Sequence, residues 1–335
     1  MSLYRFFLGL VGCVLIFYGG PLRADGGAHH LSEVSGSQRS AAGAQRVYVL
    51  EAGSITARYS DLVAGGGSRP VKVPVSVLLI QHPRGWILYD TGFGLDYENY
   101  LDRFPFNILR YFVKTDVSQE KSVVKQIEKI GLSPKDIGWI FVSHLHYDHV
   151  GGLKDFPQAR IVMSEKEWAD GMFGGYFSHL VRGYISDQYR GIEDRLQLIN
   201  YDALPPREGF PSYDVFEDGS LQLMETVGHT AGHQSLLITL QSGLKILAVG
   251  DAAYTATNYK ESRPTGWRIR SLVRYNASQQ KTSQRRIKEY EETHPKTIIF
   301  VGHDPDLWPQ RQSAGTLKPQ RGDGPQWKKF PDYYQ

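Results

Sequence analysis

Runs of apolar and β-branched residues recur along the chain, and several of them end beside a glycine, a histidine or an aspartate. Such runs cover residues 85–89, 139–143, 221–227, 244–249 and 297–301. Short apolar runs bounded by turn residues predict buried strands. The sequence therefore predicts that polar side chains able to bind a metal or take part in catalysis lie where strands end.

Helical stretches are predicted near residues 120–130 and 279–292, and the first half of the chain is rich in strands from Arg46 onward. Strands and helices together indicate an α/β (α+β) fold. Each half is expected to supply a sheet whose outer face is covered by a helix. With 335 residues, of which 41% are hydrophobic and 22% charged, the chain can bury a large core, and one globular domain over residues 46–310 is the preferred interpretation. We find no convincing short-period repeat.

Four potential metal ligands occur within six residues, at His144, His146, Asp148 and His149. Nothing in a packed core requires that density of imidazole and carboxylate groups. These ligand types suit zinc, iron, cobalt or manganese, and a site of this kind with an open position is typical of hydrolytic chemistry.

Three later motifs extend the ligand set, each directly after a predicted strand. They contain His229 and His233, then Asp251, then His303. Any one of these residues alone is as readily explained by a hydrogen-bonded histidine or turn aspartate. All of them at strand-to-loop junctions beside glycine favour a shared site on one rim of the fold.

These motifs resemble those of the metallo-β-lactamase superfamily, and within it most of all those of the N-acyl-homoserine lactone lactonases. The resemblance runs from about Val47 to Pro309. Tyr254, three residues after Asp251, is the more discriminating feature, because the lactonases carry a substrate-contacting tyrosine there. One departure is Tyr147, where phenylalanine is common. The motifs that carry the resemblance are Leu88-Tyr89-Asp90-Thr91-Gly92, Ser143 to His149, Gly228 to Ser235, Asp251 to Tyr254 and Phe300 to Asp304.

The resemblance implies a four-layer αβ/βα sandwich and a pair of divalent metal ions, with zinc preferred and iron, cobalt or manganese as alternatives. His144, His146 and His229 would hold the first metal, and Asp148, His149 and His303 the second. Asp251 would bridge them, since a carboxylate has two oxygens that can span two cations. A bridging aspartate also argues against β-lactam hydrolysis.

The expected reaction is attack of a metal-bridging hydroxide on an ester carbonyl. Tyr254 would polarise the carbonyl oxygen, and Asp148 would carry a proton to the leaving oxygen. The alternative for Tyr254 is an ordinary buried tyrosine.

Two residues near the candidate ligands are expected to form hydrogen bonds rather than to bind a metal. Asp90, at the end of the strand 85–89, is a candidate partner for the second nitrogen of a metal-bound imidazole, as metal-binding histidines usually require. An Asx turn that satisfies its own backbone is the alternative. His233 is interpreted as a structural hydrogen-bonding residue rather than a metal ligand.

The amino terminus has signal-peptide anatomy over residues 1–24, with an apolar stretch at 6–20 after Arg5. A flexible leader over residues 25–45 and a tail over 311–335 are predicted to flank the domain. A periplasmic or secreted location follows. A lipobox ending at Cys13 and an uncleaved membrane anchor are less favoured alternatives, and either would attach the protein to a membrane.

Charge and cysteine content exclude several classes of function. Loss of residues 1–24 removes Arg5, Arg23 and the only cysteine, Cys13, and leaves 36 basic against 35 acidic residues, a net charge of +1. Disulfides and thiolate ligands are then excluded. There is also no overall electrostatic case for binding nucleic acid.

The expected function is therefore a dinuclear metal hydrolase that opens the ring of N-acyl-homoserine lactones or related lactones. The alternatives are a thioesterase of the glyoxalase II type, another esterase, a metal-free scaffold, or a nucleic-acid-processing hydrolase. Aromatic segments at 97–112, 172–189 and 258–275 could line a substrate pocket, although packing on the sandwich is the simpler interpretation. The sequence leaves the oligomeric state open.

Overall fold

The computed structural model describes residues 43–111, 113–272 and 276–306. The predicted signal peptide, most of the leader, the possible lipobox and the tail lie outside these residues. Within the described ranges no helix is both long and apolar enough to cross a membrane.

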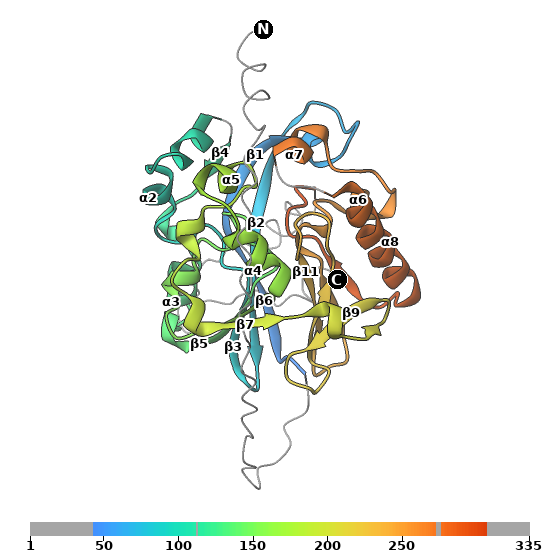
Figure 1. Cartoon of the computed structure of the whole chain (residues 1–335). Coiled ribbons are helices and arrows are strands. Elements are labelled where there is room, and N and C mark those ends of the chain that lie inside the picture. The colour runs from blue at the N-terminus through green and yellow to red at the C-terminus, as the bar shows by residue number, and fades with distance from the viewer. Residues whose placement is uncertain (1–42, 112, 273–275, 307–335) are drawn as a thin grey trace, which may run out of the picture. The chain divides into compact units, whose positions relative to one another are not determined.

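Two β-sheets face each other (Figure 1). The first has seven strands in the order β4-β1-β2-β3-β5-β6-β7, and the second has six in the order β13-β12-β11-β10-β9-β8. An N-terminal part of the chain, residues 46–199, therefore builds one sheet and residues 206–300 build the other, close to the predicted division into halves. The strands are β1 (Arg46–Arg58), β2 (Pro70–His82), β3 (Gly85–Tyr89), β4 (Lys114–Asp116), β5 (Ile137–Phe141), β6 (Arg160–Ser164), β7 (Leu196–Ile199), β8 (Pro206–Arg207), β9 (Phe210–Asp214), β10 (Leu221–Glu225), β11 (Gln234–Thr239), β12 (Lys245–Ala248) and β13 (Ile298–Phe300).

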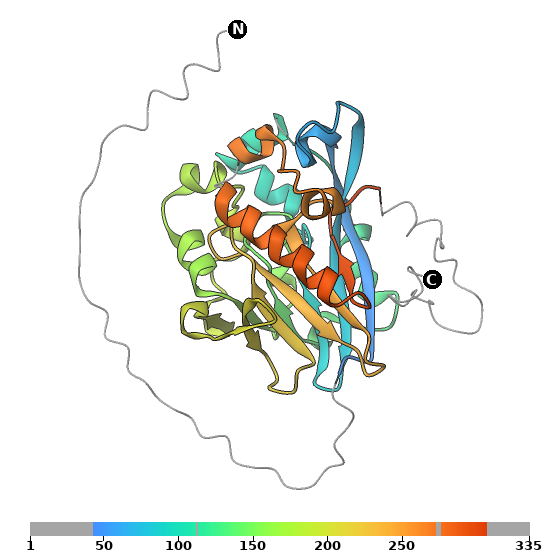
Figure 2. The ribbon, with the colours of Figure 1, turned by 90° about the vertical axis from the view of Figure 1, so that its right-hand side faces the viewer.

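Helices cover the outer faces of both sheets. The longest, α8, lies across the second sheet, as Figure 2 shows, while α3 and α4 lie on the side of the first sheet (Figure 1). The predicted four-layer α/β arrangement is confirmed. The α-helices are α1 (Tyr59–Leu62), α2 (Tyr97–Leu101), α3 (Val123–Glu128), α4 (Glu165–Met172), α5 (Tyr176–Leu180), α6 (Ala256–Lys260), α7 (Trp267–Leu272) and α8 (Ala277–Thr293).

Short 3₁₀ helices occur in the connections. They are η1 (Phe106–Tyr111), η2 (Gln119–Lys121), η3 (Pro134–Asp136), η4 (Leu153–Asp155), η5 (Ser186–Gln188), η6 (Glu193–Arg195), η7 (Tyr201–Ala203) and η8 (Gly250–Ala252).

Alternation along the strands divides the apolar side chains among three layers of core. In β2, Leu78 and Ile80 face the space between the sheets, whereas Val77 and Leu79 face the helices outside. This is the period-two alternation of a strand that is covered on both faces. On the far side, Ile287 and Tyr290 of α8 pack on the outer face of the second sheet.

The predicted elements differ from the observed ones mainly at their ends. The strand at 85–89 and the helix at 279–292 are found nearly as predicted, as β3 and α8. The helix at 120–130 is instead divided into η2 and α3, because Ser122 has extended backbone and its hydroxyl caps α3 by accepting a hydrogen bond from the Lys125 N–H. α3 ends at Glu128, and Gly131, in the left-handed region at φ +81°, follows and donates its N–H to the Glu128 carbonyl.

Candidate metal centre

Strand direction brings all seven predicted ligands to one edge of the sandwich. β3 and β5 are parallel, as are β12 and β13, and β10 runs in the same direction as β12 because both pair antiparallel with β11. The carboxyl ends of neighbouring strands with the same direction meet at one edge, so residues after β5, β10, β12 and β13 can converge. They form two buried groups, one of His144, His146, His229 and Asp251, the other of Asp148, His149 and His303.

The first group contains three imidazole nitrogens that point at a common centre. His146 Nδ1 lies 2.9 Å from His144 Nε2 and 2.9 Å from His229 Nε2, and the latter two nitrogens are 3.2 Å apart. Three mutually close ring nitrogens cannot all be satisfied by hydrogen bonds to each other, since each neutral nitrogen is either one donor or one acceptor. Their lone pairs are arranged as they would be around a cation.

The second group has the same convergence with a carboxylate. His149 Nε2 and His303 Nε2 are 3.1 Å apart. Asp148 Oδ2 lies 3.7 Å and 3.6 Å from these two nitrogens, respectively. The group offers two nitrogens and an oxygen, a mixed donor set that suits a divalent transition metal.

The two oxygens of Asp251 face different groups. Oδ2 lies 3.2 Å from His229 Nε2 and 3.8 Å from His144 Nε2 in the first group. Oδ1 lies 3.2 Å from His303 Nε2 and 3.4 Å from His149 Nε2 in the second. One carboxylate therefore spans both groups, and the residues present fit a pair of divalent metal ions.

Electrostatics distinguishes the two groups. Burial, together with neighbouring histidines, holds the pKa of His144 well below its ordinary value, and burial lowers the pKa of His146 to about 4. In the second group burial also opposes the charged form, but Asp251 and Asp148 outweigh it and raise the pKa of His149 to about 10. The first group thus presents neutral imidazoles with free lone pairs, and the second attracts positive charge.

Neighbouring groups hold the ligands in orientation. Asp90 Oδ2 lies 2.8 Å from His149 Nδ1, and the same carboxylate accepts hydrogen bonds from the Ser143 N–H and hydroxyl. Asp90 thus contacts a candidate ligand directly, from a backbone position with a φ of +63°. The Pro74 carbonyl lies 2.6 Å from His303 Nδ1.

His233 is directed at the backbone rather than at the centre. Its Nε2 accepts a hydrogen bond from the Asp251 N–H at 3.0 Å, and its Nδ1 lies 2.9 Å from the Thr226 hydroxyl. Burial lowers its pKa to about 4, so the ring is neutral and can accept that bond. These contacts are the structural ones expected from the sequence.

Tyr254 borders both groups. Its ring stacks on His303 with centroids 5.8 Å apart, and its hydroxyl lies 3.4 Å from His229 Nδ1. Tyr147, between two ligands in the sequence, turns away and stacks on Tyr97 with centroids 6.1 Å apart. The tyrosine that departs from the expected phenylalanine is therefore part of the aromatic packing behind the ligand loop.

The sequence interpretation missed Glu167 of α4. Its side chain is fully buried, and its carboxylate accepts hydrogen bonds from Leu145 N and Gly232 N, at 2.8 Å and 3.0 Å. A glutamate in an amphipathic helix carries no motif, and the only available signal was its place on the face of α4 opposite the exposed Glu165.

The aromatic segments divide between core and surface. Tyr97, Tyr100 and Phe106 are buried, whereas Phe104 and Phe177 are 67% and 57% exposed and meet edge to face at 5.5 Å. Residues 97–111 and 172–189 thus lie against each other, and Trp267 of the third segment is 64% exposed.

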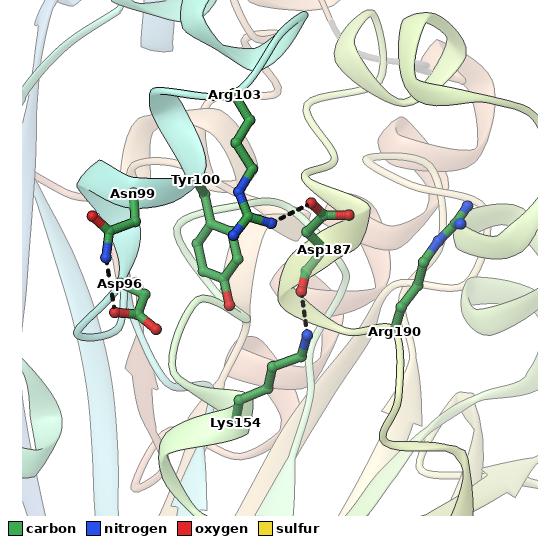
Figure 3. A pocket seen from close by; sticks show the side chains of 7 residues that line it. All are labelled: Asp96, Asn99, Tyr100, Arg103, Lys154, Asp187 and Arg190. Atoms are coloured by element: carbon green, nitrogen blue, oxygen red, sulfur yellow. Dashed lines mark hydrogen bonds and ion pairs between the residues drawn. The ribbon is translucent and has the colours of Figure 1, made fainter.

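A separate polar cavity of about 300 Å³ lies where these first two segments approach η4 (Figure 3). Arg103 pairs with Asp187 at 2.9 Å across it. None of its lining residues is a candidate metal ligand. They are Asp96, Asn99, Tyr100, Arg103, Lys154, Asp187 and Arg190.

Comparison with protein families gives a match to the metallo-beta-lactamase superfamily over residues 71–303, a range that contains all seven candidate ligands. The chain is 29% identical over 270 residues to the N-acyl homoserine lactonase AttM of Rhizobium radiobacter, covering 80% of this chain and 97% of that protein.

Solved structures share the fold. An N-acyl homoserine lactone hydrolase with the product N-hexanoyl-L-homoserine bound at its catalytic metal centre superposes with a TM-score of 0.65 at 23% identity, covering 83% of this chain and 99% of that one. AidC, a dizinc quorum-quenching lactonase, gives a TM-score of 0.55 at 18% identity, covering 78% and 91%.

Proposed function

The chain belongs to the metallo-β-lactamase superfamily, and we propose that it is a hydrolase that opens the ester ring of N-acyl-homoserine lactones at a dinuclear metal centre. The similarity to AttM spans nearly the whole of that lactonase, so it concerns the entire catalytic domain and not the shared metal motifs alone. Opening such a ring removes a quorum-sensing signal.

The observation that carries the proposal is the position of Asp251. Its two oxygens lie 3.2 Å from His229 and 3.2 Å from His303, one in each group. A carboxylate shared in this way creates a site for two cations rather than two independent sites. We propose that His144, His146 and His229 hold the first ion, that Asp148, His149 and His303 hold the second, and that Asp251 bridges them.

The identity of the ions is proposed to be zinc. Histidine and aspartate donors accept zinc, iron, cobalt or manganese, and AidC, which shares the fold, is a dizinc lactonase. When bound, two such ions would make water acidic enough to act as a nucleophile near neutral pH and would polarise the ester carbonyl.

Two side chains of this protein have roles beyond metal binding. Asp148 borders the space between the groups, with Oδ2 3.6 Å from His303 Nε2, and its carboxylate is placed to take a proton there and pass it to the departing ring oxygen. The Tyr254 hydroxyl lies on the first-group side, beside His229, where it can donate a hydrogen bond to the carbonyl oxygen as negative charge develops.

The location of the protein is also a proposal. We propose that the protein is exported and cleaved after Ala24, and that it acts in the periplasm or outside the cell. The apolar stretch at 6–20, followed by a small residue before Asp25, supports this proposal. We expect the measured mass of the mature protein to match a chain that begins at Asp25. A mass that matches a chain beginning at a lipidated Cys13 would contradict this proposal.

A substrate panel tests the proposed function. The zinc-loaded protein should hydrolyse N-acyl-homoserine lactones of several chain lengths and should prefer them to glutathione thioesters and to β-lactams. Lactone hydrolysis is measured by the acid that ring opening releases. Activity on thioesters with no turnover of any lactone would replace the proposal with the glyoxalase II alternative.

A further inference from the structure

Glu167 of α4 joins the two loops that supply the histidines of the first group. One carboxylate oxygen accepts a hydrogen bond from the N–H of Leu145, which lies between His144 and His146. The other accepts hydrogen bonds from the Thr230 hydroxyl, at 2.7 Å, and from the Gly232 N–H, at 3.0 Å. Thr230 follows His229 directly, and Gly232 lies in the same loop. A single buried side chain therefore holds loops that are about 85 residues apart in sequence, as the His144–His229 separation shows.

Close packing reinforces these hydrogen bonds. A Cβ atom on Gly232 would overlap the backbone nitrogen of Glu167, and one on Gly171 would overlap the Leu145 side chain. Both loops thus pack directly against α4. Leu145 is held twice, through its N–H by Glu167 and through its side chain against the helix.

The second group lacks this support. Over the described residues, the hydrogen bonds of Glu167 reach Leu145, Thr230, Gly232 and the Tyr184 hydroxyl, and none reaches His149, His303 or the residues next to them in sequence. The orientation of His149 depends instead on Asp90. His149 thus has its own carboxylate partner, whereas Glu167 contacts residues beside His144, His146 and His229.

We propose that Glu167 is a positioning residue for the first metal site, which sets the distance between the His144–His146 loop and His229 and thereby the affinity of that site alone. The inference rests on the dinuclear centre of the proposed function, but not on the identity of its substrate. Ring nitrogens that share one tetrahedral zinc ion lie about 3.3 Å apart. The observed separations of 2.9 Å and 3.2 Å are close to this, so loss of the contacts that hold the two loops should weaken binding.

The test measures zinc affinity of each site separately in the full chain. In a His303→Ala background only the first group keeps its full set of donors, and in a His146→Ala background only the second does. Zinc dissociation constants are measured in both backgrounds by competition with a chromophoric chelator, with and without Glu167→Gln. The glutamine has one acceptor oxygen and cannot accept hydrogen bonds from both loops.

We expect Glu167→Gln to weaken zinc binding about tenfold or more in the His303→Ala background and less than twofold in the His146→Ala background. Glu165→Gln, the same change at an exposed position of the same helix, should alter neither. Equal weakening in both backgrounds would show a general loss of structure and overturn the proposal, as would unchanged affinity at the first site.

A milder variant keeps the test decisive if Glu167→Gln does not fold, as judged by circular dichroism of the metal-free protein. Thr230→Val removes one of the hydrogen bonds without changing side-chain shape and should weaken only the first site, by about threefold. No change would overturn the proposal. Because zinc binding is measured without substrate, a failure to hydrolyse lactones would count against the proposed function and leave this inference standing.

Discussion

At the scale of single residues, the chemistry depends on the difference between one carboxylate and the imidazoles around it. Each histidine directs one nitrogen into its own group, whereas Asp251 directs an oxygen into each, at 3.2 Å from His229 and from His303. The electrostatic consequence is also visible, because the surrounding histidines hold the pKa of Asp251 well below its ordinary value despite burial. Asp251 is thus ionised and available to two cations.

Replacing Asp251 with asparagine should therefore show whether binding of two metal ions depends on this carboxylate. The amide keeps one oxygen and places an N–H₂ group toward the other site. We expect bound metal, measured by elemental analysis, to fall from about two per chain to one or fewer, and lactone turnover to fall at least about 100-fold. The matched change at the exposed Asp194 should leave both unchanged. Two ions per chain in Asp251→Asn would contradict the bridging role.

Removal of the Tyr254 hydroxyl tests a role in catalysis without a role in metal binding. Tyr254→Phe keeps the ring that stacks on His303 but loses the donor beside His229. We expect kcat to fall about 100-fold, as for loss of one hydrogen-bond donor to a developing oxyanion, with metal content unchanged. Unaltered turnover would assign this residue to packing alone.

Asp155 gives a stability effect that depends on pH and lies apart from the ligands. Burial raises its pKa from 3.8 to about 6, although a hydrogen bond from the Leu95 N–H partly opposes this. The folded state therefore binds the proton more tightly than the unfolded state, so this group favours folding below pH 3.8 and loses that contribution as pH rises through 6.

Asp155→Asn should remove this dependence. The free energy of unfolding of the variant, relative to the native protein, should rise by about 1–3 kcal/mol between pH 4 and pH 6.5 and then stay level. Urea unfolding at a series of pH values measures it. A difference that is constant across this range would mean that Asp155 has an ordinary pKa in the folded protein.

At the scale of elements, the positions of the candidate ligands could be predicted because strands end where apolar runs end. The histidines and aspartates beside those ends needed no knowledge of tertiary structure, and β3 was found with its predicted bounds. The interruption between η2 and α3 was not predicted, since helical periodicity continues through Ser122 while its hydroxyl favours a cap. Glu167 was missed because its partners are backbone groups of distant loops, which leave no mark in the local sequence.

Close approach of two loops limits substitution next to the ligands. Gly151 donates its N–H to the Gly92 carbonyl, and a Cβ atom there would overlap the Phe93 carbonyl group. Backbone atoms cannot move aside as a flexible side chain can. The loop after His149 is thus held against the turn that carries Asp90.

Gly151→Ala should accordingly lower the free energy of unfolding by about 3 kcal/mol or more, with a loss of bound metal. Gly138→Ala in β5 is the matched control, because the nearest atom to a Cβ there is the Trp86 carbonyl oxygen at 4.0 Å. Denaturant midpoints of the two variants provide the comparison. Similar stability of both would show that the loops can separate without cost.

At the scale of the whole molecule, the metal centre joins the two sheets. Each group takes ligands from both halves of the chain: His144 and His146 meet His229 in one, and His149 meets His303 in the other. Two bound ions would therefore act as cross-links between the sheets at the edge where the inter-sheet core ends. Sequence alone could suggest this only through the family resemblance, because strand order and direction decide which ends coincide.

Removal of metal should consequently affect stability as well as activity. Chelation followed by dialysis should abolish lactone hydrolysis and lower the thermal midpoint by several degrees, because ions that bind only the folded state stabilise it by mass action. Zinc should restore both. An unchanged thermal midpoint after chelation would indicate that the ions do not stabilise the edge where the two sheets meet.

The order of the ligands along the chain has a consequence for synthesis. His303 lies 52 residues beyond Asp251 and is the last of the seven to leave the ribosome. A nascent polypeptide has no complete second group until almost all of the domain has emerged. The centre can therefore take up both ions only once nearly the whole domain has been synthesised.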